Sequence, residues 1–148
     1  MRLEIYVSNI RNPAIQKHAQ ARWMICAYQG DKVQDQRKGS VTLSNATTKK
    51  AALVALRDAL KIFNKAAVIK IYVQDDFVRN MLRGKMPERW AANNWRLLRY
   101  NREIHHLELW QEISCLLKIH AVSFAGADET AGNIKIKELE ELIKNVRN

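Results

Sequence analysis

The hydrophobic period of the chain changes from two to 3.6 near residue 46, and this switch restricts the fold more than any other feature. Before it, residues 2–7 (RLEIYV) alternate apolar and polar side chains, which predicts a strand whose second face is polar or partly covered. Residues 9–20 are expected to form a loop. Residues 21–29 and 34–44 predict two further strands joined by a glycine-containing turn. Three strands in succession favour an antiparallel meander.

After the switch, helices predominate. The pattern predicts a helical stripe at 52–63 with Thr47 among its candidate caps, a strand at 67–73, a helix from Asp75 or Asp76 to Gly84, a short helix at 87–94, a basic loop at 95–103, a helix at 107–117, a strand at 120–124, a loop at 125–133 and a final helix at 134–146. A helix between the third and fourth strands makes a crossover. This connection favours a parallel pairing of the fourth strand with an earlier one.

Length and composition then exclude several classes of protein. The chain has 148 residues, which fits a single domain over 1–148 with one sizeable core. No apolar run approaches the roughly 20 residues that a membrane helix needs, and the start (MRLEIYVSN) lacks the apolar segment of a secretory signal. The two cysteines have no paired spacing, so neither a disulfide framework nor a zinc site is expected. These features favour a cytoplasmic globular domain without a membrane partner.

Five local motifs follow one another along the chain. They are IYVS at 5–8, TTKKAALVALRDAL at 47–60, IKIYVQDDFVRNML at 69–82, LWQ at 109–111 and HAVSFAG at 120–126. Their order, spacing and sequence resemble the type I ribonuclease H family over nearly the whole chain. The resemblance implies an α/β, ribonuclease H-like fold: a five-stranded mixed sheet, with three antiparallel strands and then parallel additions, flanked by helices.

The resemblance also identifies where catalytic groups would stand. Family members cleave the RNA strand of RNA–DNA hybrids with two Mg²⁺ ions held by four carboxylates. Those four positions fall here on Ser8, Ala52, Gln74 and Lys137, and the histidine of the family's mobile loop falls on Phe124. A hydroxyl, a methyl, an amide and an ammonium do not supply the anionic oxygen ligands that Mg²⁺ requires. We therefore expect a ribonuclease H-like pseudoenzyme with no metal cofactor.

Other acids offer an alternative. Asp75 follows Gln74 directly, and Asp128, Glu129 or Glu138 are candidates to approach it from the last loop and helix. Such a displaced acid set would give an active, Mg²⁺-dependent ribonuclease H. The competing interpretation is that Asp75 or Asp76 caps a helix, while the other acids are solvated.

The positive charge has a location. The 25 lysines and arginines exceed the 15 acids by ten, which indicates a polyanionic partner such as nucleic acid. Residues 83–104 are rich in basic and aromatic side chains and resemble the basic handle with which some family members grip the DNA strand of the hybrid. The expected nucleic-acid contacts in this segment are Lys85, Arg89, Trp90, Trp95, Arg96 and Arg99. The competing interpretation is that the tryptophans pack the segment onto the core.

Thr47 and Lys49 match a loop that family members use around a substrate phosphate. A hydroxyl, the N–H groups of a helix start and an ammonium together make an anion pocket. Three hypotheses follow for the whole chain. It binds duplex nucleic acid or an RNA–DNA hybrid without cutting it, it is an active nuclease built around Asp75, or it is a scaffold that docks on another protein. The sequence leaves the oligomeric state open.

Overall fold

Strand β1 (Arg2–Asn9) lies inside the sheet and determines how the rest of the chain packs. It pairs antiparallel with β2 (Gln16–Gln29) and parallel with β4 (Val68–Val73). Because neighbours flank it on both sides and helices cover both faces, every residue from Glu4 to Asn9 is buried. The second face of this strand is therefore covered more completely than the alternation alone predicts.

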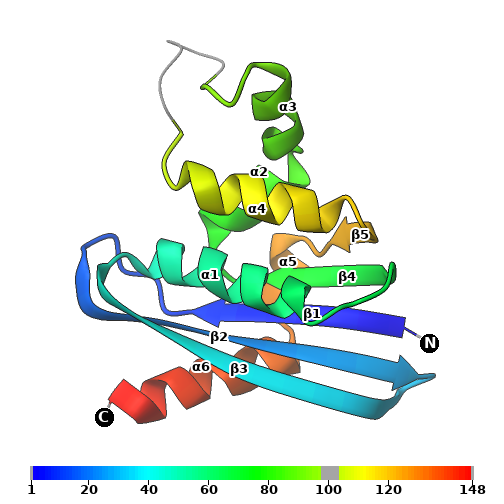
Figure 1. The fold of residues 1–148 in the computed structure, drawn as a ribbon. Coiled ribbons are helices and arrows are strands. Elements are labelled where there is room, and N and C mark those ends of the chain that lie inside the picture. The colour runs from blue at the N-terminus through cyan, green and yellow to red at the C-terminus, as the bar shows by residue number, and fades with distance from the viewer. Residues whose placement is uncertain (1, 98–103, 148) are drawn as a thin grey trace.

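The computed structural model describes residues 2–97 and 104–147, and its sheet has the strand order β3-β2-β1-β4-β5 (Figure 1). β3 (Lys32–Ala46) pairs antiparallel with β2, and β5 (Ala121–Phe124) pairs parallel with β4. The predicted five-stranded mixed sheet is confirmed, including the parallel pairing of the fourth strand. The described helices are α1 (Thr48–Lys61), α2 (Asp76–Arg83), α3 (Met86–Ala92), α4 (Leu107–Leu117), α5 (Ala127–Ala131) and α6 (Ile134–Arg147).

Two cores lie on opposite faces of the sheet. On one face, Ile5 and Val7 pack with the apolar side of α1, and α4 lies against α1. On the other face, Tyr6 and Met24 pack against α6 through Ile136 and Leu139. Figure 1 shows α1 and α4 on one side of the strands and α6 on the other. Among residues 2–97 and 104–147, no helix has the length and apolar character needed to cross a membrane.

Two segments predicted as loops contain regular structure. β2 already begins at Gln16, where its pairing with Ala46 of β3 lengthens the hairpin beyond the apolar run from which the strand was predicted. The predicted loop at 125–133 contains the short helix α5, whose first turn carries Asp128 and Glu129. Acids at a helix start are stabilised by the helix dipole, and this local signal was outweighed by the two glycines nearby.

Candidate nucleic-acid interface

Ser8 and Gln74 lie side by side at the ends of two parallel strands. The Gln74 backbone N–H donates to the Val7 carbonyl oxygen at 2.9 Å, which carries the β1–β4 pairing one residue beyond β4. The Ser8 hydroxyl donates to Gln74 Oε1 at 2.5 Å, and the Asn9 backbone N–H donates to the same oxygen at 3.2 Å. Because parallel strands present their carboxyl ends at one edge of the sheet, the fold brings these positions together.

Helix α6 contributes Glu140 to this place. Gln74 Nε2 donates to Glu140 Oε2 at 3.0 Å, and Lys144 Nζ lies 3.3 Å from Glu140 Oε1. Lys137, the residue expected from the sequence motif, is exposed. Glu140 follows the buried Ile136 by four residues and so lies on the helix face that packs on the sheet. That spacing was the signal available in the sequence, and motif matching across a loop of variable length missed it.

Asp75 completes what we call the strand-end cluster, which consists of Ser8, Asn9, Gln74, Asp75 and Glu140. Its carboxylate caps α2, because Oδ1 accepts the Val78 backbone N–H at 3.0 Å. Its second oxygen, Oδ2, accepts Asn9 Nδ2 at 3.1 Å. The Asp75 side chain is buried, and both of its carboxylate oxygens accept hydrogen bonds from groups within the protein. The structure therefore uses Asp75 as a helix cap.

The strand-end cluster does not fit a pair of Mg²⁺ ions. Ala52 contributes a fully buried methyl group from α1, and the cluster has only two carboxylates, both bonded to protein groups. In the described part of the chain, no group of three or more His, Cys, Asp or Glu residues is placed to hold a metal ion. Two divalent cations a few ångströms apart require several free carboxylate oxygens, which this arrangement lacks.

The other acids considered for a displaced site lie elsewhere. Glu129 on α5 accepts an ion-paired hydrogen bond of 2.5 Å from Lys70 Nζ on β4. This hydrogen bond is the main reason why the pKa of the Glu129 carboxyl is below its usual value. Glu138 lies 3.8 Å from Lys135 on its own helix. Neither acid contacts Asp75 among the interactions of the described residues.

A groove beside the cluster contains the predicted phosphate loop. This cavity of about 350 Å³ is what we call the anion groove, and it is lined by Arg11, Asn12, Pro13, Thr47, Thr48, Lys49, Asp75, Asp76 and Phe77. The Thr47 hydroxyl oxygen accepts the Lys50 backbone N–H at 3.1 Å and so caps α1. Lys49 Nζ lies 3.9 Å from the centre of the Phe77 ring. A helix start without acids in its first turn and a nearby ammonium favour an anion beside Thr47 and Lys49. The groove is also lined by Asp75 and Asp76, whose carboxylates are bonded to Asn9, to the Val78 N–H and to Arg79.

The basic segment divides into packing and exposed residues. Trp90 is 3 % exposed, and its ring makes an edge contact with Trp110 at 5.4 Å between centroids. Stacking on a base needs an open ring face, so the burial of Trp90 favours the packing interpretation, and its role as a nucleic-acid contact stays a prediction. Trp95 is partly buried against the same core, whereas Arg89 and Arg96 are exposed. Arg99 lies outside the described residues.

Lys85 lies apart from the anion groove. It precedes α3 in the left-handed conformation, with a φ of 55°, and lines a different cavity between α3 and β5. In Figure 1, α3 stands on the α4 side of the molecule, away from the sheet. The predicted contact residues therefore form a groove set (Thr47, Lys49), an α3 set (Arg89, Arg96, with Trp95 partly buried) and Lys85.

Solved structures with the same arrangement of strands and helices identify the fold. The protein described as "LC9-RNase H1, a type 1 RNase H with the type 2 active-site motif" superposes with a TM-score of 0.74 at 17% identity, covering 95% of this chain and 69% of that one. The chain has a ribonuclease H fold. A foamy viral protease-reverse transcriptase, solved in complex with an RNA/DNA hybrid, contains the same fold, with a TM-score of 0.65 at 16% identity over 94% of this chain and 18% of that one.

Sequence comparison agrees with this fold. A ribonuclease H of Chlorobium phaeobacteroides is 29% identical over 105 residues, which are 68% of this chain and 71% of that protein. A ribonuclease H of Caldicellulosiruptor saccharolyticus is 25% identical over 107 residues, 70% of this chain and 73% of that protein. No protein-family model matches the chain.

Proposed function

We propose that this chain belongs to the ribonuclease H family and binds an RNA–DNA hybrid or a related duplex without cleaving it at two metal ions. One observation supports the absence of cleavage at two metal ions. The Ser8–Gln74–Glu140 hydrogen bonds close the place where hard cations would need free carboxylates. The residues present satisfy one another, and a Mg²⁺ pair has no ligand set there.

The binding part rests on charge and on its placement. The formal net charge is +10, and Lys49 with Arg11 lines a groove at the start of α1. Helix N–H groups and ammonium side chains hold phosphates. Arg89 and Arg96 are exposed near α3, and guanidinium groups bind phosphate oxygens in a bidentate manner. Similarity to named ribonucleases H, and to a fold solved with a hybrid, supports a hybrid as the ligand.

The test is a binding titration of a fluorescent RNA–DNA hybrid in EDTA at low salt. We expect affinity without Mg²⁺, weakened several-fold by Lys49→Gln. Lys32→Gln is the matched control because Lys32 is an exposed lysine on β3, away from the groove. Absence of affinity for hybrid, double-stranded RNA and double-stranded DNA alike would refute the proposal. A protein partner recovered after nuclease treatment would then favour the scaffold hypothesis.

A second candidate is a metal-dependent ribonuclease H with a displaced acid set. The comparisons favour this candidate more than the loss of activity, because the similar curated proteins are named ribonuclease H. Its acids would be Asp75 and, in this structure, Glu140. Both would have to leave their present hydrogen bonds to bind Mg²⁺.

Activity separates the two candidates. The enzyme hypothesis expects hybrid cleavage with Mg²⁺ or Mn²⁺ that is lost in both Asp75→Asn and Glu140→Gln. Thermal melts of both variants control for folding, because Asp75 also caps α2. No cleavage by the unaltered protein at high concentration, together with hybrid binding, supports our proposal.

A further inference from the structure

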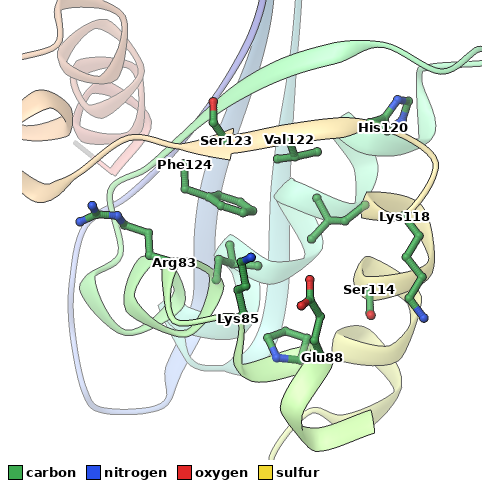
Figure 2. Close-up of a pocket in the computed structure, with 12 residues that line it drawn as sticks. Arg83, Lys85, Glu88, Ser114, Lys118, His120, Val122, Ser123 and Phe124 are labelled. Atoms are coloured by element: carbon green, nitrogen blue, oxygen red, sulfur yellow. The ribbon is translucent and has the colours of Figure 1, made fainter. Parts of the chain in front are cut away.

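A second cavity lies on a different part of the molecule, between α3, the end of α4 and β5. Its volume is about 440 Å³, within the range of roughly 300–1,000 Å³ that small-molecule sites occupy. We call it the α3–β5 cavity. It shares no lining residue with the anion groove or with the strand-end cluster. Figure 2 shows the Phe124 ring and the Glu88 carboxylate directed into this space, with Lys85 beside them.

Polar groups line the cavity without partners of their own. Ser114 lines the cavity and makes no side-chain hydrogen bond within residues 2–97 and 104–147, but its hydroxyl oxygen is not among the buried atoms there that lack a partner, so it is accessible from the cavity. In the same described part of the chain, Lys85, Glu88 and Lys118 form no ion pair and no side-chain hydrogen bond. These groups are therefore available to a bound molecule.

The backbone at Lys85 adopts an energetically unfavourable conformation. Lys85 has a φ of 55°, a conformation that L side chains adopt at an energetic penalty, although a glycine precedes it at position 84. The turn between α2 and α3 thus carries a lysine at the position where glycine would be strain-free. Lys85 and Phe124 both line this cavity (Figure 2).

The charge around the cavity is positive and comes from a definite set of groups. Lys85 and Lys118 line the cavity together with one carboxylate, Glu88, whereas the Arg83 guanidinium lies against Gly126 of the neighbouring loop. His120 does not add to this charge. Its Nδ1 accepts the Ala67 backbone N–H at 3.0 Å, and burial holds the pKa of the imidazole below its usual value. The remaining walls are apolar, formed chiefly by Leu82, Pro87, Leu117 and Val122.

We propose that the α3–β5 cavity binds a nucleoside 5′-monophosphate. An aromatic base fits against Phe124 and the apolar walls, and the phosphate faces the cationic rim. Glu88 accepts a hydrogen bond from an amino or hydroxyl group. A simple aromatic acid would leave Glu88 without a donor, and inorganic phosphate would leave the apolar walls uncovered. The same chemistry is offered by a free nucleotide and by the 5′-phosphorylated end of a strand.

The experiment titrates the full chain with the four ribonucleoside 5′-monophosphates, using calorimetry. Lys85→Gln and Lys118→Gln should each weaken binding roughly fivefold, the loss that follows from one exposed ion pair of about 1 kcal/mol. Lys17→Gln is the control, because Lys17 is an exposed lysine on β2 outside the cavity. Phe124→Leu should weaken binding of the nucleotides but not that of inorganic phosphate.

Two further arms complete the test. Comparing 5′-phosphorylated with 5′-hydroxyl trinucleotides distinguishes a strand end from a free nucleotide. Lys49→Gln should leave monophosphate binding unchanged while it weakens hybrid binding, and Lys118→Gln should do the reverse. Failure of this inference is therefore separable from failure of the proposed function. No binding of any monophosphate at millimolar concentrations, or inorganic phosphate binding as tightly as the nucleotides, would overturn it.

Discussion

At the scale of single residues, Gln74 decides the character of the strand-end cluster. Its amide oxygen accepts from Ser8 and from the Asn9 backbone, and its amide nitrogen donates to Glu140. An amide is the side chain that can do both, because it carries an acceptor and a donor at one end. A carboxylate at this position would accept from Ser8 but would repel Glu140. The same backbone at the strand ends can therefore carry either neutral side chains that bond to one another or carboxylates that bind metal ions.

This alternative predicts a gain of metal binding. In the double variant Ser8→Asp/Gln74→Asp, three carboxylates with Glu140 would converge at the strand ends. Without metal, like-charge repulsion should lower the melting temperature. Added Mn²⁺ should restore it, since binding to the native state alone stabilises that state. Thermal melts with and without Mn²⁺ measure this response, and the unaltered protein serves as the control. An equal Mn²⁺ response in both proteins would contradict our description of the cluster.

Substitutions of Trp90 test whether its side chain packs in the core or stacks on a base. Trp90→Ala should lower the free energy of unfolding by about 3–5 kcal/mol, the usual cost of removing a large buried aromatic side chain. Denaturant titration measures this loss. Trp90→Phe, which keeps an aromatic ring next to Trp110, should bind the hybrid as the unaltered protein does. A large loss of hybrid affinity in a folded Trp90→Phe variant would favour the stacking role.

At the scale of elements, the long β2–β3 hairpin depends on one close contact. Gly39 of β3 lies opposite Trp23 of β2, and a Cβ atom at position 39 would collide with the indole ring. The Trp23 side chain is buried between this backbone and the core around α1, so it has little room to move. Glycine is required here for space, whereas Gly30 in the hairpin turn has a φ of 62° and is required for its conformation.

Gly39→Ala should therefore destabilise the protein by about 1–3 kcal/mol through overpacking. Chemical denaturation followed by tryptophan fluorescence measures the change. Ser40→Ala is the matched control, because Ser40 is exposed on the same strand. If Gly39→Ala and Ser40→Ala had the same small effect, the close approach of Trp23 to the β3 backbone would be contradicted.

The start of β5 predicts a pH dependence of stability. The neutral His120 imidazole accepts the Ala67 backbone N–H, and burial lowers its pKa in the folded state. As pH falls through the unfolded value of about 6.5, the unfolded chain takes up a proton that the folded chain resists, so stability is lost. The free energy of unfolding should decrease between pH 7 and 5.

His120→Asn separates this contribution from other groups. The asparagine amide oxygen can still accept the Ala67 N–H but does not titrate, so the decrease in stability should be smaller in the variant. His106, whose pKa is lowered mainly by burial, keeps its own contribution. Denaturant titrations at several pH values measure both slopes, and identical slopes in the two proteins would rule out a role for His120.

At the scale of the whole molecule, the surplus of ten positive charges predicts how a duplex binds. Affinity should fall linearly with salt on logarithmic axes, by about 0.9 for each phosphate contact. The slope should be the same in EDTA and in Mg²⁺ after correction for ionic strength, because in our proposal duplex binding needs no metal ion. Lys49→Gln should reduce the slope by about one contact, as anisotropy titrations would measure. A slope near zero would exclude phosphate contacts as the source of affinity.

Much of the fold could be predicted because the apolar pattern reports it locally. Most of the stripe predicted at 52–63 lies on the buried face of α1, although Phe63 lies beyond the helix end at Lys61. Thr47 caps that helix, and the helix predicted at 107–117 has the same limits as α4. The candidate site was only partly accessible. Thr47 and Lys49 were identified through a motif, whereas Glu140 was missed because its partner, Gln74, is 66 residues away. The sequence left packing and stacking open for Trp90, because the burial of its ring depends on Trp110, which belongs to another helix.

The sequence by itself determined the order of strands and helices apart from the short helix α5, the excess of positive charge and the neutral side chains at Ser8, Ala52 and Gln74. These follow from residue type and periodicity, which are local properties. Only the tertiary structure decided which residue of α6 reaches Gln74, that Asp75 has both oxygens bonded, and that Lys85 borders a separate cavity. The physical reason is that hydrogen bonds and cavities depend on atoms brought together from distant parts of the chain. Their geometry is defined only once the sheet and its helices have packed.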